Sequence, residues 1–361
     1  METITIEVRS RLRSCNIFIS TRDIFENNWI QLKLNESVIS LRIGNQIKYL
    51  PLKSIKIIPK TISSLTVASN WISLRVQTHP IQPAHGSFKT ELVGTTDVSG
   101  HSKPKSEDIE LCLKEKECVL VCSRCKNDLS KVLLFKRILP LPTSNCDPGE
   151  WFCCKHDGDA YSTIPDPRES DCFYENDNQL LNKAIFNEEL KIHEDNDTVK
   201  CNRCLSVFGG RSTFKNSVKI WNCCVDYKFL DNSLAVYKAS DPLKDFSLII
   251  NDKTDIFTGN RLLVEAIDVN RSHYLLVQLM DKNLELLTEK NRSELSNANT
   301  IELTASRVTK ILYKYTETEE EIKSYCVDIE RCQVALPVML AAMDHLLLTT
   351  ERYPPSYRIV D

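Results

Sequence analysis

The chain has 361 residues, about the length of two or three domains, which is enough to bury a sizeable core. Its net charge of -3, with acidic and basic residues mixed, gives no reason to expect a nucleic acid as partner. The N-terminus does not resemble a signal peptide, and no run of 18 apolar residues could span a bilayer. We therefore expect an intracellular protein without a membrane partner, in the cytoplasm or, as a further option, in the nucleus.

Residues 1–78 are predicted to form β-strands. Ile4, Ile6 and Val8 alternate with polar residues, and the stretches 39–43 and 72–76 show the same alternation. Strands with one apolar face are typical of an antiparallel sheet or sandwich, here a scaffold without a visible catalytic constellation. Residues 79–108 contain Pro, Gly and isolated His, which predicts a linker or a long surface loop.

The stretch 109–230 is predicted to be a Cys-rich zinc module. Eleven of the fifteen cysteines lie between Cys118 and Cys224, where two Cys-x-x-Cys pairs stand out: Cys122 with Cys125, and Cys201 with Cys204. Each pair supplies two thiolates from one tight turn, and two pairs complete a four-sulfur zinc shell. In a reducing compartment, metal explains clustered cysteines better than disulfides do.

Two other interpretations of these cysteines stay open. They could be small buried hydrophobic residues, or a redox couple, although a redox motif would be expected in a βαβ context and the flanks here alternate like antiparallel strands. Between the two pairs lie Cys153, Cys154, His156 and Cys172. Because adjacent strand residues point to opposite faces, we expect one of Cys153 and Cys154 to be a ligand and the other a packing residue or a ligand to a second metal.

The last region, residues 231–361, is predicted to be α+β. We expect a short helix over 261–268, a hairpin from 273 to 288 that turns at 281–283, and a strand over 308–315. A helix is predicted over 334–348, because Pro337 suits a helix start and apolar residues recur every three or four positions. The predicted fold class for the chain is therefore α+β with mostly antiparallel β-structure.

Several sequence elements together resemble those of the HECT-like ubiquitin ligases that bind ubiquitin-conjugating enzymes. They are the first Cys pair, Leu139-Pro-Leu-Pro142, Glu150-Trp151-Phe-Cys153-Cys154, Asp171-Cys172-Phe173 and Val199-Lys-Cys201-Asn-Arg-Cys204. The resemblance is dense over residues 118–210 and looser towards both ends. The family pattern reads Trp-x-Cys-His where this chain has Cys153 followed by Cys154, and Cys can replace His as a zinc ligand. The resemblance therefore makes Cys153, Cys154 and Cys172 the next candidate zinc ligands after the two Cys pairs, with His156 as a further one.

The resemblance implies a ligase with structural zinc that binds a ubiquitin-loaded conjugating enzyme and promotes ubiquitin transfer, leading to proteasomal degradation. The implied partners are the conjugating enzyme, ubiquitin and a protein substrate, for which a cyclin-type protein is one option. The implied contact with the conjugating enzyme follows the second Cys pair, where the sequence has four aromatic residues: Phe214, Trp221, Tyr227 and Phe229. Aromatic side chains are frequent interface anchors, but these could equally be core residues.

The catalytic route is open at this point. A HECT ligase carries ubiquitin on a cysteine within a sequence such as His-Thr-Cys, which this chain lacks. Of the two C-terminal cysteines, Cys326 and Cys332, the second adjoins Arg331 and is the catalytic candidate; its alternative is an ordinary, partly buried cysteine. We favour a scaffold that positions the charged conjugating enzyme. The alternative function is a non-catalytic, zinc-stabilised binding adaptor.

Overall fold

The computed structural model describes residues 1–21, 30–80, 112–141, 166–187, 192–193, 197–212, 215–230, 236–256, 261–268, 271–293, 295, 298–323 and 329–358. Several sequence predictions fall outside these ranges: Cys153, Cys154, His156, Phe214, Cys326 and residues 81–108 of the predicted linker.

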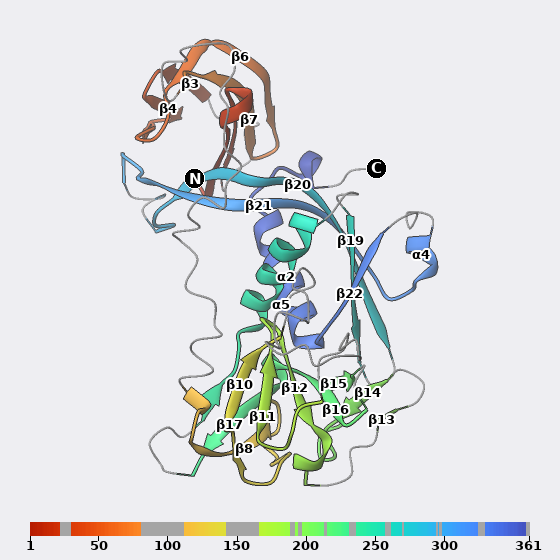
Figure 1. The fold of residues 1–361 in the computed structure, drawn as a ribbon. Helices are drawn as coiled ribbons and strands as arrows, with labels where there is room; N and C mark the ends of the chain where they lie inside the picture. Colours follow the sequence, from red (N-terminus) through yellow and green to blue (C-terminus); the bar gives the residue numbers. More distant parts are fainter. Residues whose placement is uncertain are drawn as a thin grey trace, which may run out of the picture. The chain divides into compact units, whose positions relative to one another are not determined.

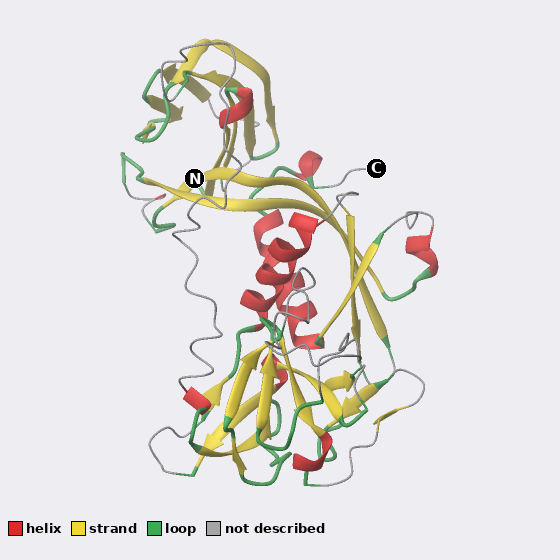
Figure 2. Cartoon of the chain, in the orientation of Figure 1, coloured by secondary structure: helices red, strands yellow, loops and turns green. Residues whose placement is uncertain are grey.

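The chain divides into two compact units, each assembled from separate stretches. Unit 1 comprises residues 1–94, 279–312 and 344–361, and unit 2 comprises residues 95–278 and 313–343. Three elements have residues in both: β20 (Ser272–Glu289), β21 (Leu303–Thr316) and α5 (Leu336–Thr350), all labelled in Figure 1. Strands predominate in the chain, as the yellow arrows of Figure 2 show, and most of their pairings are antiparallel.

Unit 1 contains two antiparallel sheets. The larger has the order β6 (Ile57–Ala68), β7 (Trp71–Thr78), β2 (Ser14–Ser20), β1 (Thr3–Arg9) and the second part of β20. The smaller consists of β3 (Ile30–Asn35), β4 (Val38–Ile43) and β5 (Gln46–Pro51), and the 3₁₀ helices of the unit are η1 (Ser10–Leu12) and η6 (Pro355–Tyr357). Ile4 and Ile6 pack in one core with Ile39 and Leu41, so the apolar faces predicted for β1 and β4 do meet a core. The polar face of β1 is buried as well, because Thr5 and Glu7 have no exposed surface.

Two buried glutamates tie distant stretches of unit 1 together. The carboxylate of Glu289 accepts hydrogen bonds from Arg352, at 2.8 and 3.2 Å, and from the backbone N–H of Ile4 at 3.0 Å. Glu7 forms an ion pair with Lys310, and neither glutamate side chain has any exposed surface. The stretch around Arg352 is thus joined to the N-terminal sheet by a buried ion pair.

Unit 2 contains a seven-stranded and a four-stranded sheet. The first has the order β10 (Arg137–Pro140), β11 (Asp171–Tyr174), β12 (Asn178–Asn182), β16 (Ser217–Trp221), β15 (Val207–Arg211), β14 (Thr198–Lys200) and β13 (Ile192–His193), in which only the β10–β11 pair is parallel. The second has the order β18 (Tyr237–Lys238), β17 (Val225–Phe229), β8 (Glu117–Cys122) and β9 (Leu133–Leu134).

The rest of unit 2 includes strand β19 (Arg261–Ile267) and the two strands that pair with it. Strand β19 pairs antiparallel with the first part of β20 and parallel with β22 (Glu330–Val334). The other elements are helices α2 (Pro242–Ile256) and α4 (Glu320–Lys323) and the 3₁₀ helices η4 (Lys183–Ile185) and η5 (Asn222–Cys224). Strand 308–315 and helix 334–348 are confirmed as β21 and α5.

Two sequence predictions in this region are wrong. The expected helix over 261–268 is strand β19, whose apolar run from Leu262 to Val264 is buried because strands flank it on both sides. A short continuous apolar run fits a buried strand as well as a helix. The expected hairpin over 273–288 is the single strand β20, because its middle, 281–283, lacks the glycine that a tight hairpin turn favours and continues in extended conformation.

Candidate metal centre

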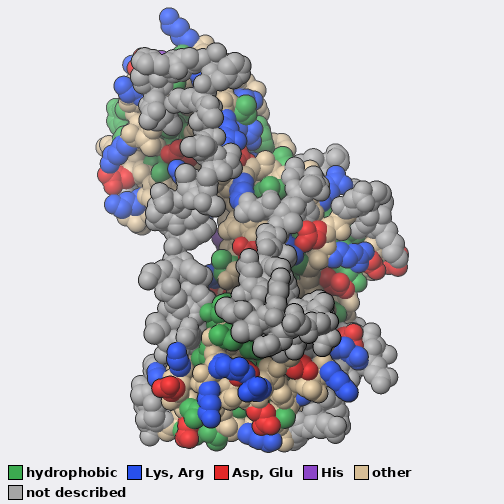
Figure 3. All heavy atoms as spheres, viewed as in Figure 1, with side chains coloured by type: hydrophobic (Ala, Val, Ile, Leu, Met, Phe, Trp, Pro, Cys, Tyr) green, Lys and Arg blue, Asp and Glu red, His purple; other side chains and the backbone are tan. Residues whose placement is uncertain are grey.

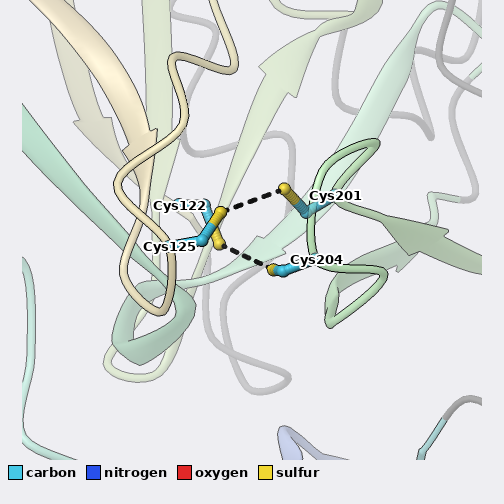
Figure 4. Close-up of side chains that lie close together, drawn as sticks. All are labelled: Cys122, Cys125, Cys201 and Cys204. Atoms are coloured by element: carbon cyan, nitrogen blue, oxygen red, sulfur yellow. Dashed lines mark hydrogen bonds between the residues drawn. The ribbon is translucent and has the colours of Figure 1, made fainter.

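The four cysteines of the two Cys-x-x-Cys pairs are brought together by two sheets of unit 2. Strand β8 ends at Cys122, so the first pair lies on the turn that leaves the four-stranded sheet. Strand β14 ends at Lys200, and the second pair lies on the turn from β14 to β15 in the seven-stranded sheet. Residues about 80 positions apart therefore face each other (Figure 4).

The first turn, Cys122 to Asn127, has a defined hydrogen-bond pattern. The N–H of Cys122 donates to the carbonyl of Asn127, and the N–H of Lys126 donates back to the carbonyl of Cys122, both at 2.9 Å. Lys126 has a φ of 59°, in the left-handed region. The tight turn leaves both sulfurs of the pair on one side.

The second turn, Cys201 to Ser206, repeats this pattern residue for residue. The N–H of Cys201 donates to the carbonyl of Ser206 at 3.0 Å, and the N–H of Leu205 donates to the carbonyl of Cys201 at 2.9 Å. Leu205, with a φ of 61°, occupies the place of Lys126. The two turns, which we call the first and second knuckle, therefore present their thiols in the same way.

The four sulfur atoms form a compact group. The Sγ atoms of Cys122 and Cys204 are 3.7 Å apart, as are those of Cys125 and Cys201, and all four lie within 4.8 Å of one another. Figure 4 shows both pairs pointing towards a common centre. Four soft donors at this spacing could hold a metal ion.

Ser206 is a further polar neighbour of the sulfurs, and the sequence prediction overlooked it. Its hydroxyl oxygen lies 3.0 Å from the Sγ of Cys204 and 3.6 Å from that of Cys122, so it contacts one ligand candidate of each knuckle. Burial raises the pKa of Cys204, but hydrogen bonds from Ser206 and the neighbouring thiols outweigh it and lower that pKa to about 6. Burial raises the pKa of Cys201 to about 12, and a bound cation would favour the thiolate form of all four residues.

Cys172 lies apart from this group. It is fully buried in β11, and its thiol donates a hydrogen bond to the side-chain carbonyl of Gln179 at 3.5 Å. Burial raises the pKa of Cys172 well above its usual value, so the residue is a neutral thiol. Among the described residues, only the four knuckle cysteines form a group that could hold a metal.

Cys332, the catalytic candidate, lies on β22 opposite Val264 of β19. Burial raises its pKa to about 12, although Lys253 lowers it in part. The neighbouring Arg331, which was expected to activate this cysteine, pairs with Glu319 at 2.7 Å. A nucleophilic thiol needs a lowered pKa, so these surroundings favour an ordinary, partly buried cysteine.

The three described aromatic candidates for partner contact are buried. Trp221 closes β16, and Tyr227 and Phe229 belong to β17. The ring of Tyr227 packs edge to face against Phe135, with centroids 6.3 Å apart. These surroundings are those of core aromatics, the alternative that the sequence left open.

The surface and the helices add two observations. On the face drawn in Figure 3, basic and acidic side chains are interspersed, in keeping with the small net charge. Among the described residues, every helix is too short or too polar to cross a membrane.

A family model described as HECT-like Ubiquitin-conjugating enzyme (E2)-binding matches residues 7–361. The match includes both knuckles and nearly the whole of both units. No curated protein and no solved structure matches the chain.

Proposed function

This chain belongs to the HECT-like ubiquitin-conjugating enzyme (E2)-binding family, and from that membership we propose that it is a ubiquitin-protein ligase. The family match, which extends over nearly the whole chain, carries the proposal and gives a ubiquitin-conjugating enzyme as its partner. Ubiquitin and a protein substrate, cyclin-type or another, are the further partners that the reaction requires. The reaction belongs in the cytoplasm or nucleus, where thiols stay reduced.

We propose zinc as the metal of the four-cysteine site. With Zn–S bonds of about 2.3 Å, the edges of a tetrahedron of sulfurs are about 3.8 Å long. Two of the sulfur pairs are 3.7 Å apart, and the others lie within 4.8 Å, so the donor set fits the ion. Four protein ligands leave no open position for substrate or water, and the zinc is therefore structural.

The structural role follows from what the knuckles connect. Cys122 and Cys125 continue from the four-stranded sheet, whereas Cys201 and Cys204 lie within the seven-stranded sheet. A shared ion crosslinks the two sheets of unit 2, and its binding free energy becomes folding free energy. Cys153 and Cys154 stay as candidates for a second metal site or for packing, whereas the buried thiol of Cys172 fits a packing role.

The proposed mechanism is positioning without a ubiquitin adduct on this chain. Binding of the charged conjugating enzyme brings its thioester and an acceptor lysine together, which lowers the barrier through proximity and orientation. The raised pKa of Cys332 supports this route over transfer through a thioester on this chain.

The deciding experiment is single-turnover discharge of a panel of ubiquitin-loaded conjugating enzymes. Wild type, Cys326→Ser and Cys332→Ser are compared on non-reducing gels. We expect wild type to accelerate discharge, with no reducible adduct on the chain and no loss in either variant. An adduct that one substitution abolishes identifies a thioester ligase and its nucleophile.

A second candidate function is a non-catalytic adaptor, which the closed four-cysteine site also fits. In that case the chain binds a conjugating enzyme but leaves the discharge rate unchanged. Binding is therefore measured in parallel with discharge. Failure of both binding and discharge with every enzyme in the panel contradicts the ligase and the adaptor alike.

The zinc assignment has its own test. We expect the double substitution of Cys122 and Cys125 by Ser to remove the bound metal and to unfold unit 2, because metal binding and folding are coupled. Metal content is measured by elemental analysis, and Cys332→Ser is the control that keeps its metal. Full metal content and an unchanged melting temperature in the double variant contradict the assignment.

A further inference from the structure

Leu205, at the tip of the second knuckle, is exposed although it is apolar. The residue is 55% accessible, so more than half of its surface is open to a partner. Its φ of 61° is a conformation that glycine and asparagine adopt readily and that a bulky side chain adopts at a cost. A leucine here stabilises neither the turn nor the core of unit 2.

The first knuckle uses the equivalent position differently. Lys126 has the same left-handed conformation, but its ammonium group pairs with the buried carboxylate of Asp226. Its side chain therefore contributes to the packing of its own sheet. Because the two knuckles share one backbone pattern, the contrast isolates the side chain of Leu205 as the feature that the fold leaves unused.

Each knuckle also carries one exposed arginine. Arg203 lies two residues before Leu205, and Arg124 occupies the same place in the first knuckle. Within the part of the chain that the structure describes, neither guanidinium forms an ion pair. The backbone hydrogen bonds of the knuckle hold Leu205 in place, so little conformational entropy is lost when a partner covers it.

We propose that Leu205 and Arg203 of the second knuckle, together with Arg124 of the first knuckle, form the contact for the ubiquitin-conjugating enzyme. The family match gives a conjugating enzyme as the binding partner, and an exposed leucine with exposed arginines in the same pair of turns fits an apolar anchor within a charged rim. The inference rests on the proposed function and specifies its binding surface. In this proposal Leu205 and the two arginines contact the enzyme in place of the buried Trp221, Tyr227 and Phe229.

The test is the affinity of a panel of purified ubiquitin-conjugating enzymes for Leu205→Gly, measured by biolayer interferometry. Glycine removes the apolar side chain and also relieves the left-handed backbone, so metal content and melting temperature are kept or raised. We expect at least a tenfold weaker affinity for the enzyme that binds wild type most tightly. Leu205→Asn, which also suits this conformation, is the second variant and is expected to give the same loss.

Lys126→Gly is the matched control for the backbone change at the equivalent place in the first knuckle. Because it also removes the ion pair to Asp226, its affinity is measured at a temperature below its own melting temperature. We expect its affinity to stay within twofold of wild type. Arg203→Glu is expected to slow association, most strongly at low salt, since an exposed charge acts mainly through steering.

The two failures are distinguishable. If wild type binds an enzyme of the panel and both Leu205 variants bind it equally well with their metal retained, the inference is wrong and the proposed function stands. If wild type binds no enzyme, the proposed function is wrong and the inference falls with it.

Discussion

Replacing Arg352 with Ala tests whether the buried ion pair holds unit 1 together. The Glu289 side chain is 0% exposed and the Arg352 side chain 20%, so the substitution leaves a buried carboxylate without its main cation. Two hydrogen bonds to that carboxylate, at 2.8 and 3.2 Å, disappear, and so does a third from Arg352 to the carbonyl of Ile4 at 3.4 Å. The N–H of Ile4, at 3.0 Å, is retained.

The expected loss follows from these contacts. Removing one partner of a buried ion pair costs about 3–5 kcal/mol. Because the N–H of Ile4 still solvates the carboxylate, we place Arg352→Ala at the lower end, about 3 kcal/mol. With a urea dependence of about 1–3 kcal/mol per M, the midpoint of unfolding falls by roughly 1–3 M.

Arg292→Ala is the matched control, because this arginine contacts the same carboxylate from the surface. Its Nε lies 3.5 Å from Glu289, and its side chain is 66% exposed. An exposed partner of this kind contributes about 0–1 kcal/mol. Pulsed hydrogen exchange across a urea series, read on peptides from β1 and β2, follows unit 1 separately from unit 2.

The reasoning is refuted if Arg352→Ala and Arg292→Ala shift the urea midpoint equally. A double variant, Glu289→Leu with Arg352→Leu, sharpens the test. Replacing both charges by apolar groups is often close to neutral, so we expect it to recover much of the stability that the single Arg352→Ala variant loses.

Three further predictions concern unit 2. Ser206→Ala removes the hydroxyl beside two sulfurs, so we expect faster release of metal to a chelator. The release rate of the control Asn127→Ala should match that of wild type, because the Asn127 side chain donates to a backbone carbonyl instead of a sulfur. Gly209→Ala places a Cβ 2.3 Å from a carbonyl oxygen of β16 and should cost about 1–3 kcal/mol, whereas an unchanged melting temperature contradicts this close approach. Burial raises the pKa of Asp171, but hydrogen bonds from Arg137 outweigh it and lower that pKa below its usual range. This ion pair therefore stabilises unit 2 above about pH 4 and is lost as pH falls through the lowered pKa, so Asp171→Asn should lower the urea midpoint at pH 7 more than at pH 3.

The parts of the fold that could be predicted from the sequence are those with local signals. Ile4, Ile6 and Val8 face a core and alternate with polar residues, so a period of two in residue type marks β1 even though those polar residues are buried too. The run from Leu262 to Val264 is buried on both faces and has no such period, which is why β19 was mistaken for a helix. The pairing of Glu289 with Arg352 joins residues 63 positions apart and leaves no local trace.

The start of helix α2 has a local sequence signal that the sequence prediction missed. Asp241 precedes Pro242, and its carboxylate accepts a hydrogen bond from the N–H of Lys244 at 3.0 Å, as expected of an N-cap. A proline at the first helical position is a further start signal.

The candidate site divides in the same way. Each Cys-x-x-Cys knuckle is a local motif, so the spacing alone pointed to the four cysteines. Ser206 acts across the site on a thiol 84 residues earlier in the chain, which only the folded structure shows. Residue type suggested Trp221 as an interface anchor, but burial rather than type separates it from the exposed Leu205.

Because unit 1 is built from three separate stretches of the chain, its fold can be completed only after the third stretch has been translated. Both knuckles lie between residues 122 and 206, so a nascent chain can capture a metal ion while Arg352 has yet to be translated. Strands β1 and β2 leave the ribosome before Lys310 and Arg352, which supply the cations for Glu7 and Glu289. Domains usually finish folding in the order of their translation, whereas here β1 and β2 wait for stretches that are translated after most of unit 2. A stop codon before residue 352 is therefore expected to yield protein that carries its metal and is nonetheless a client of chaperones.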